Sequence, residues 1–437
     1  MLLVELIDFL KKEVAPLRKF TSRGLDLEQY KEPAISHPIK SFYDVKTVFL
    51  PVSEDLCITP NEKLCRGKLI SRGIRPESVD SFSSIDGTAV AVGEFEFEKF
   101  EGLRFLRIDA NGKTEIPDMQ KYRDAEISDE DIAFAINECG ILNTTDKRTL
   151  KEIYEEYPNG VRNLVIDAID DEPYVSSRIS QLLFRSEHIV PAIRALNRVF
   201  GAKNIRIDIY DKNDDITIRM PHNIGGYTVN HVKQNYPVSR MMRSDKETVY
   251  IGVGALLSFY YSAVDKCAWT YTIVTVAGDS VKNPTNIEVP IGTPIGDILD
   301  FCGLVKKPKT VILGGSMTGY IVNGTDIPVL RSTKAVLAFS EELSCETYSC
   351  IGCGKCIDVC PEELLPYYIY TYYLDNNIEK LYRLSADRCT ECGCCSYICP
   401  AKIDLRQYVK LSRRTLLKEM WQNEQNGQDR ESTVCEK

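Results

Sequence analysis

The pattern of apolar and polar residues predicts a β-rich segment in the first third of the chain. Short runs rich in β-branched and aromatic residues, such as residues 47–50 and 88–92, alternate with turn signals at Arg66-Gly67 and Asp86-Gly87. Many short strands with little helix between them are typical of a small barrel or sandwich. We therefore expect a β-rich domain over residues 46–127.

The middle of the chain has a mixed pattern. Two apolar runs, residues 164–169 and 205–209, read as strands, and they flank a helical pattern from about Ile179 to Phe200. Strand, helix and strand in this order predict a parallel βαβ unit. Residues 128–268 are therefore expected to form an α/β domain.

A third pattern covers residues 269–338. Residues 271–276 and 286–289 read as two strands of a hairpin, followed by a helix from about Pro294 to Cys302 and a strand at residues 310–313. A hairpin, a helix and a strand in this order suit a compact α+β module.

The two ends of the chain are patterned differently from the middle. Within residues 1–45, Leu3, Leu6, Ile7 and Leu10 share one face of a predicted helix. This helix either packs on its own protein or docks on a partner subunit, and the sequence leaves both interpretations open. Residues 416–437 form a polar tail that is expected to fray.

Composition limits the function. The 437 residues carry a net charge of −9, which argues against nucleic acid as the main partner. No stretch approaches the ~18 apolar residues of a membrane span, and the first apolar stretch lacks the order of a signal peptide. There are 16 cysteines but only 4 histidines. In the reducing cytoplasm that we expect for this chain, clustered cysteines are metal ligands before they are disulfides.

The cysteines follow a motif that occurs twice. Residues 350–360 and 389–399 each have the spacing C-x2-C-x2-C-x3-C, followed by proline. This is the spacing with which bacterial ferredoxins hold two [4Fe–4S] clusters, the fourth cysteine of each run binding the other cluster. The expected ligands are Cys350, Cys353, Cys356 and Cys399 for cluster 1, and Cys389, Cys392, Cys395 and Cys360 for cluster 2.

The same region allows a zinc-binding interpretation, an additional cysteine ligand and a role for its tyrosines. Two structural zinc sites are the alternative, but zinc does not require the third cysteine, the fourth cysteine and the proline. Cys394 is left out, since its use would break the spacing. Between the motifs, residues 361–388 contain six tyrosines, five of them within residues 367–373, and for these five packing of a helical insert is favoured over an aromatic electron relay.

These motifs resemble a known family, the C subunit of the Rnf ferredoxin:NAD oxidoreductase (RnfC). The cysteine block C-I-G-C-G-K-C-I-D-V-C-P resembles its ferredoxin-type domain, and V-T-V-A-G-D-S-V-K-N-P-T-N resembles its soluble-ligand-binding β-grasp (SLBB) domain. The resemblance implies a multidomain α+β and α/β protein. Its expected parts are an N-terminal helix and linker (1–45), a barrel-sandwich hybrid-like domain (46–127), a degenerate Rossmann-like domain (128–268), an SLBB β-grasp domain (269–338), a helical domain with two [4Fe–4S] clusters (339–415) and a polar tail (416–437).

The resemblance fails where the family binds FMN and NADH. The family's glycine-rich loop, of the G-L-G-G-A-G-F-P kind, is replaced by residues 139–148, which keep one glycine and contain Asp146. The family's N-G-A-E-C-E-P-Y stretch appears as residues 167–174, with Asp170 and Asp171. Loss of glycines removes close backbone approach to a phosphate, and the added acids oppose its charge. FMN is therefore not expected to bind.

The sequence thus predicts an RnfC-like electron-transfer subunit with no catalytic residues of its own. Two clusters would relay electrons between a flavin or ferredoxin partner and another redox subunit. We expect the chain in the cytoplasm of an anaerobe, associated with redox protein subunits and peripherally with a membrane complex at its inner face. The alternatives are an FMN-dependent NADH dehydrogenase with an atypical flavin site, and a zinc-bearing structural adaptor.

Overall fold

The chain forms two compact units. The computed structural model describes residues 23–434, apart from residues 74–78, 98–99, 101, 113–116, 124, 213–219, 243 and 343–345. The larger unit comprises Leu27–Lys233 and Val238–Ser344, and the smaller comprises Cys345–Lys437, Gln234–Pro237 and the chain up to Asp26. The expected apolar helix face of Leu3, Leu6, Ile7 and Leu10 lies outside the described residues.

A mainly parallel sheet forms the middle of the larger unit. Its strand order is β12-β13-β11-β10-β14, with only the edge pair β12 and β13 antiparallel. The parallel pairing of β10 with β11 confirms the predicted βαβ unit, although the crossing helical stretch is two helices, α5 and α6, that meet at Arg185. The strands are β10 (Asn163–Ala168), β11 (Asn204–Tyr210), β12 (Asn223–Ile224), β13 (Tyr227–Val232) and β14 (Thr248–Gly252).

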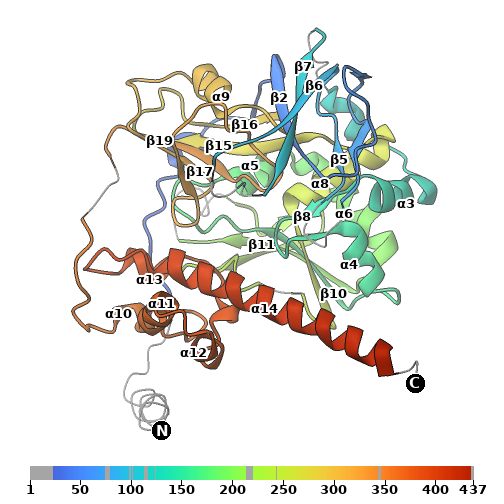
Figure 1. The fold of residues 1–437 in the computed structure, drawn as a ribbon. Coiled ribbons are helices and arrows are strands. Elements are labelled where there is room, and N and C mark those ends of the chain that lie inside the picture. The colour runs from blue at the N-terminus through green and yellow to red at the C-terminus, as the bar shows by residue number, and fades with distance from the viewer. Residues whose placement is uncertain are drawn as a thin grey trace. The chain divides into compact units, whose positions relative to one another are not determined.

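Helices with apolar faces cover this sheet. The helix α8 contacts α3, α5 and α6 as well as the strands β10 and β14, so its side chains are buried almost all round (Figure 1). A short hairpin precedes β10. The elements are α2 (Glu32–Ile35), η3 (Met119–Tyr122), α3 (Asp129–Glu138), β8 (Leu142–Asn143), β9 (Arg148–Thr149), α4 (Leu150–Glu156), α5 (Ser177–Phe184), α6 (Ser186–Phe200) and α8 (Val253–Asp265).

The predicted β-rich segment forms an antiparallel sheet of order β2-β7-β6-β3. Alternate residues of β2 are buried, as expected for a strand with one face on a core. The strands are β2 (Thr47–Val52), β3 (Lys63–Leu64), β6 (Gly87–Glu94) and β7 (Arg104–Ala110), with a separate pair β4 (Leu69–Ser71) and β5 (Ser81–Phe82).

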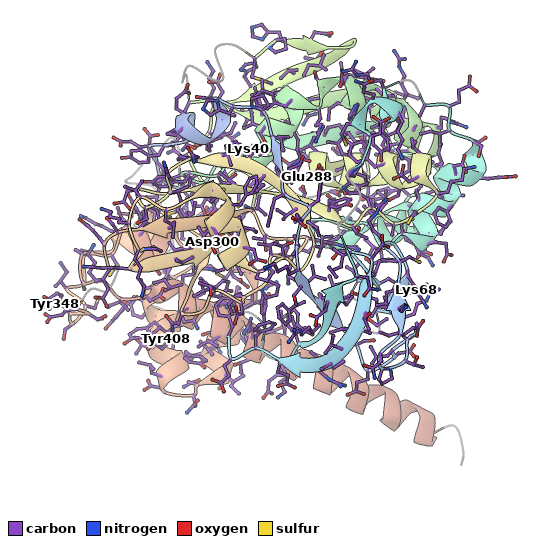
Figure 2. All side chains as sticks on the ribbon, turned by 90° about the horizontal axis from the view of Figure 1, so that it is seen from above. Lys40, Lys68, Glu288, Asp300, Tyr348 and Tyr408 are labelled. Atoms are coloured by element: carbon purple, nitrogen blue, oxygen red, sulfur yellow. The ribbon has the colours of Figure 1, made fainter. Side chains whose placement is uncertain are left out.

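A six-stranded mixed sheet has the order β1-β16-β15-β19-β17-β18. The predicted hairpin is the antiparallel pair β15 and β16, and α9 follows it as expected. The edge strand β1 comes from the start of the chain and pairs in parallel with β16, which places Lys40 near Glu288 (Figure 2). The elements are β1 (Lys40–Ser41), β15 (Tyr271–Ala277), β16 (Thr285–Pro290), α9 (Ile295–Cys302), β17 (Thr310–Leu313), β18 (Tyr320–Val322) and β19 (Ala335–Phe339).

The smaller unit is helical. Its short helices pack along one long helix, α14 (Figure 1). The polar tail is helical, since α14 continues to Val434; Gln, Glu and Arg are good helix formers, and no proline interrupts them. The elements are α10 (Lys355–Asp358), α11 (Pro366–Leu374), α12 (Ile378–Arg383), η4 (Ala386–Arg388), α13 (Cys394–Tyr397) and α14 (Leu405–Val434).

Candidate metal centre

The two cysteine loops have the same local conformation. Each begins with an extended segment and enters a one-turn helix, α10 or α13, through a glycine in the left-handed region, Gly354 (φ 73°) or Gly393 (φ 83°). A glycine is favoured there because a Cβ is strained at positive φ. The third cysteine of each motif, Cys356 or Cys395, then lies in this short helix.

The eight predicted ligand cysteines gather into two groups. The thiol of Cys356 is near enough to interact electrostatically with those of Cys350, Cys353 and Cys399. The thiol of Cys395 interacts in the same way with those of Cys392, Cys389 and Cys360, and also with that of Cys356. The fourth cysteine of each motif therefore interacts with the third cysteine of the other motif. The assignment of these eight cysteines to two clusters stays a prediction.

These thiols are hard to ionise without a cation. Burial, and secondarily the neighbouring thiols, raise the pKa of Cys360 to about 11 and that of Cys389 to about 12, although backbone N–H groups partly oppose the shift. A metal ion removes this obstacle, because its positive charge stabilises thiolates.

Among the described residues, no three His, Cys, Asp or Glu side chains are placed to hold a single metal ion. A four-iron cube offers each thiolate a separate iron atom, so its ligands need not meet at one point.

Backbone donors are aimed at the sulfur atoms. The N–H of Gly352 donates to Cys350 Sγ (3.4 Å), and that of Glu391 donates to Cys389 Sγ (3.3 Å). Such bonds are one of the means by which a protein sets the potential of an iron–sulfur cluster. The side chain of Ser396, in contrast, faces α14, where it donates to Asp404 and accepts from the N–H of Arg406.

Apolar and aromatic side chains surround the cysteines. Ala401, Ile403 and Leu405 form a small core against which four of the cysteines pack. Tyr367 and Tyr370 of α11 pack on the same core, and Tyr370 lies edge-on to Tyr408 of α14 with ring centroids 4.7 Å apart. Packing of a helical insert, the favoured interpretation, agrees with these contacts.

Two segments of the chain match known families. Residues 273–321 match the SLBB domain, and residues 349–403 match a 4Fe-4S dicluster domain. The C subunit of the ion-translocating oxidoreductase complex of Rhodobacter capsulatus is 26% identical over 397 residues, covering 80% of this chain and 75% of that protein. Over about four-fifths of its length the chain is therefore similar to an RnfC subunit.

Two further relatives of this chain are also C subunits of ion- or proton-translocating complexes. The C subunit of the proton-translocating ferredoxin:NAD(+) oxidoreductase complex of Clostridium ljungdahlii is 24% identical, covering 78% of this chain and 82% of that protein. The C subunit of the Na(+)-translocating complex of Acetobacterium woodii is 27% identical, covering 69% and 74%. Among solved structures, the NAD+-reducing [NiFe]-hydrogenase in its H2-reduced state aligns with 69% of this chain and 63% of that chain, at 14% identity and a TM-score of 0.43.

No helix among the described residues of the RnfC-like chain is long and apolar enough to cross a membrane.

The place expected for a flavin in the RnfC-like chain is closed by its own side chains. Arg178 pairs with Asp167 at the end of β10 and donates to Thr144 Oγ1 (3.1 Å). The side chain of Asn143 accepts from the N–H of Gly252 (2.9 Å) and fastens the 139–148 loop to β14. The cavity that remains here is about 100 Å³, whereas sites for ligands of this size usually measure roughly 300–1,000 Å³. These residues do not fit FMN.

The acids of this region oppose a flavin less directly than the sequence suggests. Asp146 pairs with Arg148 (2.9 Å), and Asp170 accepts from the N–H of Arg178 (2.7 Å) at the start of α5. Asp171 accepts from the N–H and hydroxyl of Ser239, both at 2.8 Å. None of the three aspartates lines the cavity, whose charged lining consists of Arg178, Arg331, Lys334 and Glu288. The expectation that these aspartates face the site is therefore wrong, because none of the three lines the cavity and each has a hydrogen-bond or ion-pair partner of its own.

One residue at the cysteine loops has no signal in the sequence. Tyr236 is fully buried, and its hydroxyl donates to the carbonyl oxygen of Cys392 (2.6 Å). It lies more than 150 residues before the motif, in the four-residue segment Gln234–Pro237 that belongs to the smaller unit. No periodicity or spacing connects so short a segment to the motif.

Proposed function

We propose that this chain is an electron-transfer subunit that relays electrons through two [4Fe–4S] clusters, between a flavin or ferredoxin partner and another redox subunit. The crossed grouping of eight thiols, within the segment that matches a 4Fe-4S dicluster domain, carries this proposal. Bound clusters supply one-electron oxidation and reduction. The first would be held by Cys350, Cys353, Cys356 and Cys399, and the second by Cys389, Cys392, Cys395 and Cys360.

The chain's own residues would perform three tasks. The cysteines bind iron as thiolates, and the N–H groups of Gly352 and Glu391 stabilise negative charge on sulfur. The core of Ala401, Ile403 and Leu405 limits the access of water from one side. No proton donor or substrate pocket is needed, since electron transfer breaks no bond in a substrate.

Partner subunits follow from the relatives. Those of Rhodobacter capsulatus, Clostridium ljungdahlii and Acetobacterium woodii are, by name, subunits of oxidoreductase complexes that translocate ions or protons. We propose that this chain also works beside redox protein subunits, peripherally at the inner face of a membrane. Anaerobic affinity purification of the full chain from its own cells should recover a flavoprotein, ferredoxin or reductase subunit in fixed ratio. Recovery of the chain alone would contradict this part of the proposal.

Metal and sulfide analysis tests the clusters. Full-length protein reconstituted without oxygen should contain about eight iron and eight sulfide per chain, the content of two cubane clusters. Stoichiometric zinc without sulfide would instead support the structural adaptor. Absence of iron and sulfide after strictly anaerobic purification would overturn the proposal.

A further inference from the structure

The two cysteine loops differ in what covers them. The motifs are related by a shift of 39 residues, so each position in one loop has a counterpart in the other. Cys353 is exposed, whereas its counterpart Cys392 is 8% exposed. The exposure of Lys355 and its counterpart Cys394 differs more, because Lys355 is exposed and Cys394 is fully buried.

The first loop faces solvent. Ile351, between two of its cysteines, is 71% exposed, and Tyr348, just before the first cysteine, stands out from the ribbon (Figure 2). Among the described residues, the Tyr348 hydroxyl donates to a near neighbour, the carboxylate of Glu346 two residues away.

The second loop lies under two segments from distant parts of the chain. Leu25 and Tyr236 pair as an antiparallel bridge, with N–H to O distances of 2.8 and 2.9 Å in the two directions. The Tyr236 hydroxyl donates to the carbonyl of Cys392, and the Cys394 thiol lies 4.0 Å from the Tyr236 carbonyl oxygen. We call Arg23–Asp26 and Gln234–Pro237 the cover.

The cover also reaches the cysteine that the first motif contributes to the second group. Arg23 donates to the carbonyl oxygen of Cys360 (3.4 Å) and pairs with Glu363 (3.1 Å). The cover is closely fitted, since a Cβ on Gly24 (φ 93°) would lie 2.1 Å from the Tyr236 carbonyl oxygen. It therefore contacts both chain segments that supply the second group of thiols.

We propose that Tyr236 is a positioning residue that, through the cover, keeps water from the cluster held by Cys389, Cys392, Cys395 and Cys360 and lowers its reduction potential relative to the other cluster. The proposal rests on the proposed function, because it requires both clusters. Reduction adds negative charge, and a buried site stabilises added charge less than an exposed one. Solvent exposure is one of the factors that set the potential of such clusters.

The test is the variant Tyr236→Phe, which removes one hydroxyl and keeps the ring. In the full chain, each cluster's midpoint potential would be measured by a redox titration followed by electron paramagnetic resonance. The variant would be combined with Cys356→Ser, which leaves the covered cluster, and with Cys395→Ser, which leaves the other. We expect an upward shift in the first background only. Loss of one buried hydrogen bond limits it to about tenfold in the ratio of reduced to oxidised cluster, or about 59 mV for one electron.

Two further variants sharpen the test. Gly24→Ala forces the two segments of the cover apart, because the added Cβ clashes with the Tyr236 carbonyl oxygen while the Tyr236 hydroxyl is kept, and it should shift the same cluster in the same direction. Tyr382→Phe removes the hydroxyl of an exposed tyrosine on α12, and it should shift neither cluster.

The outcomes are distinct. Loss of four irons confined to the covered cluster in Tyr236→Phe would also support the proposal. Unchanged potentials and iron content, or equal shifts of both clusters, would overturn it. Wild-type protein without eight iron and eight sulfide would instead refute the proposed function.

Discussion

Single residues reveal a duplication in the backbone that the cysteines alone only suggest. Three pairs of positions, each 39 residues apart, have a positive φ: Gly352 and Glu391, Gly354 and Gly393, Glu363 and Lys402. The cysteines and their glycines were predictable because metal-ligand spacing is local in sequence. The left-handed conformations of Glu391, Glu363 and Lys402 were not, because non-glycine residues seldom adopt it and no residue type signals it.

The left-handed turn before α10 gives a prediction at this scale. Gly354→Ala meets no neighbouring atom within 4 Å, so its cost is the backbone strain alone, ~1–2 kcal/mol. Gly354→Asn should cost less, because asparagine tolerates this conformation. Urea unfolding of the cluster-loaded full chain measures both. Equal stability of the alanine variant and the wild type would show that this turn does not need a glycine.

The neighbouring cysteines Cys394 and Cys395 give a second prediction. Cys395→Ser should remove half of the iron, because Cys395 lies among the thiols of the second group. Cys394→Ser should retain all of it, since this side chain is buried beside Tyr236 and Cys392 without being needed by the spacing. Iron and sulfide analysis of the two variants distinguishes them, and loss of a cluster from Cys394→Ser would mean that the ligand register is wrong.

At the scale of elements, the strand β10 was predictable from the sequence, but the contacts of the acidic residues that follow it were not. The strand follows from an apolar run, but the acids after it bind partners that are remote in sequence. Glu172 is almost fully buried, pairs with Lys334 (3.0 Å) and accepts from the N–H of Thr318 (3.0 Å). It thereby ties the parallel sheet to the six-stranded sheet. The length of α14 was not predictable either. Amphipathic patterning detects helices that pack through an apolar face, and α14 continues beyond its last apolar positions.

Glu172 makes stability depend on pH. Burial alone would raise the pKa of this carboxyl, but Lys334 and Arg240 lower it from 4.5 to about 2. A carboxyl whose pKa is lower in the folded state stabilises the protein above about pH 4.5, and this contribution, roughly 3 kcal/mol, is lost as the pH falls toward 2. Glu172→Gln should lower the unfolding free energy at pH 7 by a similar amount and flatten its dependence on pH over this range.

The control for this prediction is an exposed acid on a helix. Glu379→Gln removes an i,i+4 pair with Arg383 at the surface, which should cost less than ~0.5 kcal/mol. If Glu172→Gln were no more costly than Glu379→Gln in chemical denaturation, the connection between the two sheets would not depend on this charge.

At the scale of the whole molecule, the side chains beside the parallel sheet leave a cavity of about 100 Å³, which is too small for a flavin. The sequence predicts that FMN does not bind, because the family's glycine pattern is missing. It could not predict the size of the cavity, which is set by the pairing of Arg178 with Asp167, nor the passage of Gln234–Pro237 into the smaller unit. Both depend on contacts between residues far apart in the chain.

The small size of this cavity predicts how the whole protein responds to NADH. Reconstituted chain incubated with FMN and desalted should show no flavin absorbance, and NADH should not bleach the cluster absorbance, because the cavity is about 100 Å³. Dithionite serves as the control, since it should bleach the clusters directly. Stoichiometric flavin with NADH-driven bleaching would restore the NADH dehydrogenase alternative.

The difference between Lys355 and Cys394 leads to a prediction for other proteins with paired cysteine motifs. Each stands between the left-handed glycine and the third cysteine of its motif. A long charged side chain there must reach solvent, whereas a small apolar one is compatible with chain lying over it. In other proteins with paired motifs of this spacing, the identity of this one residue should therefore indicate which of the two loops a partner can approach.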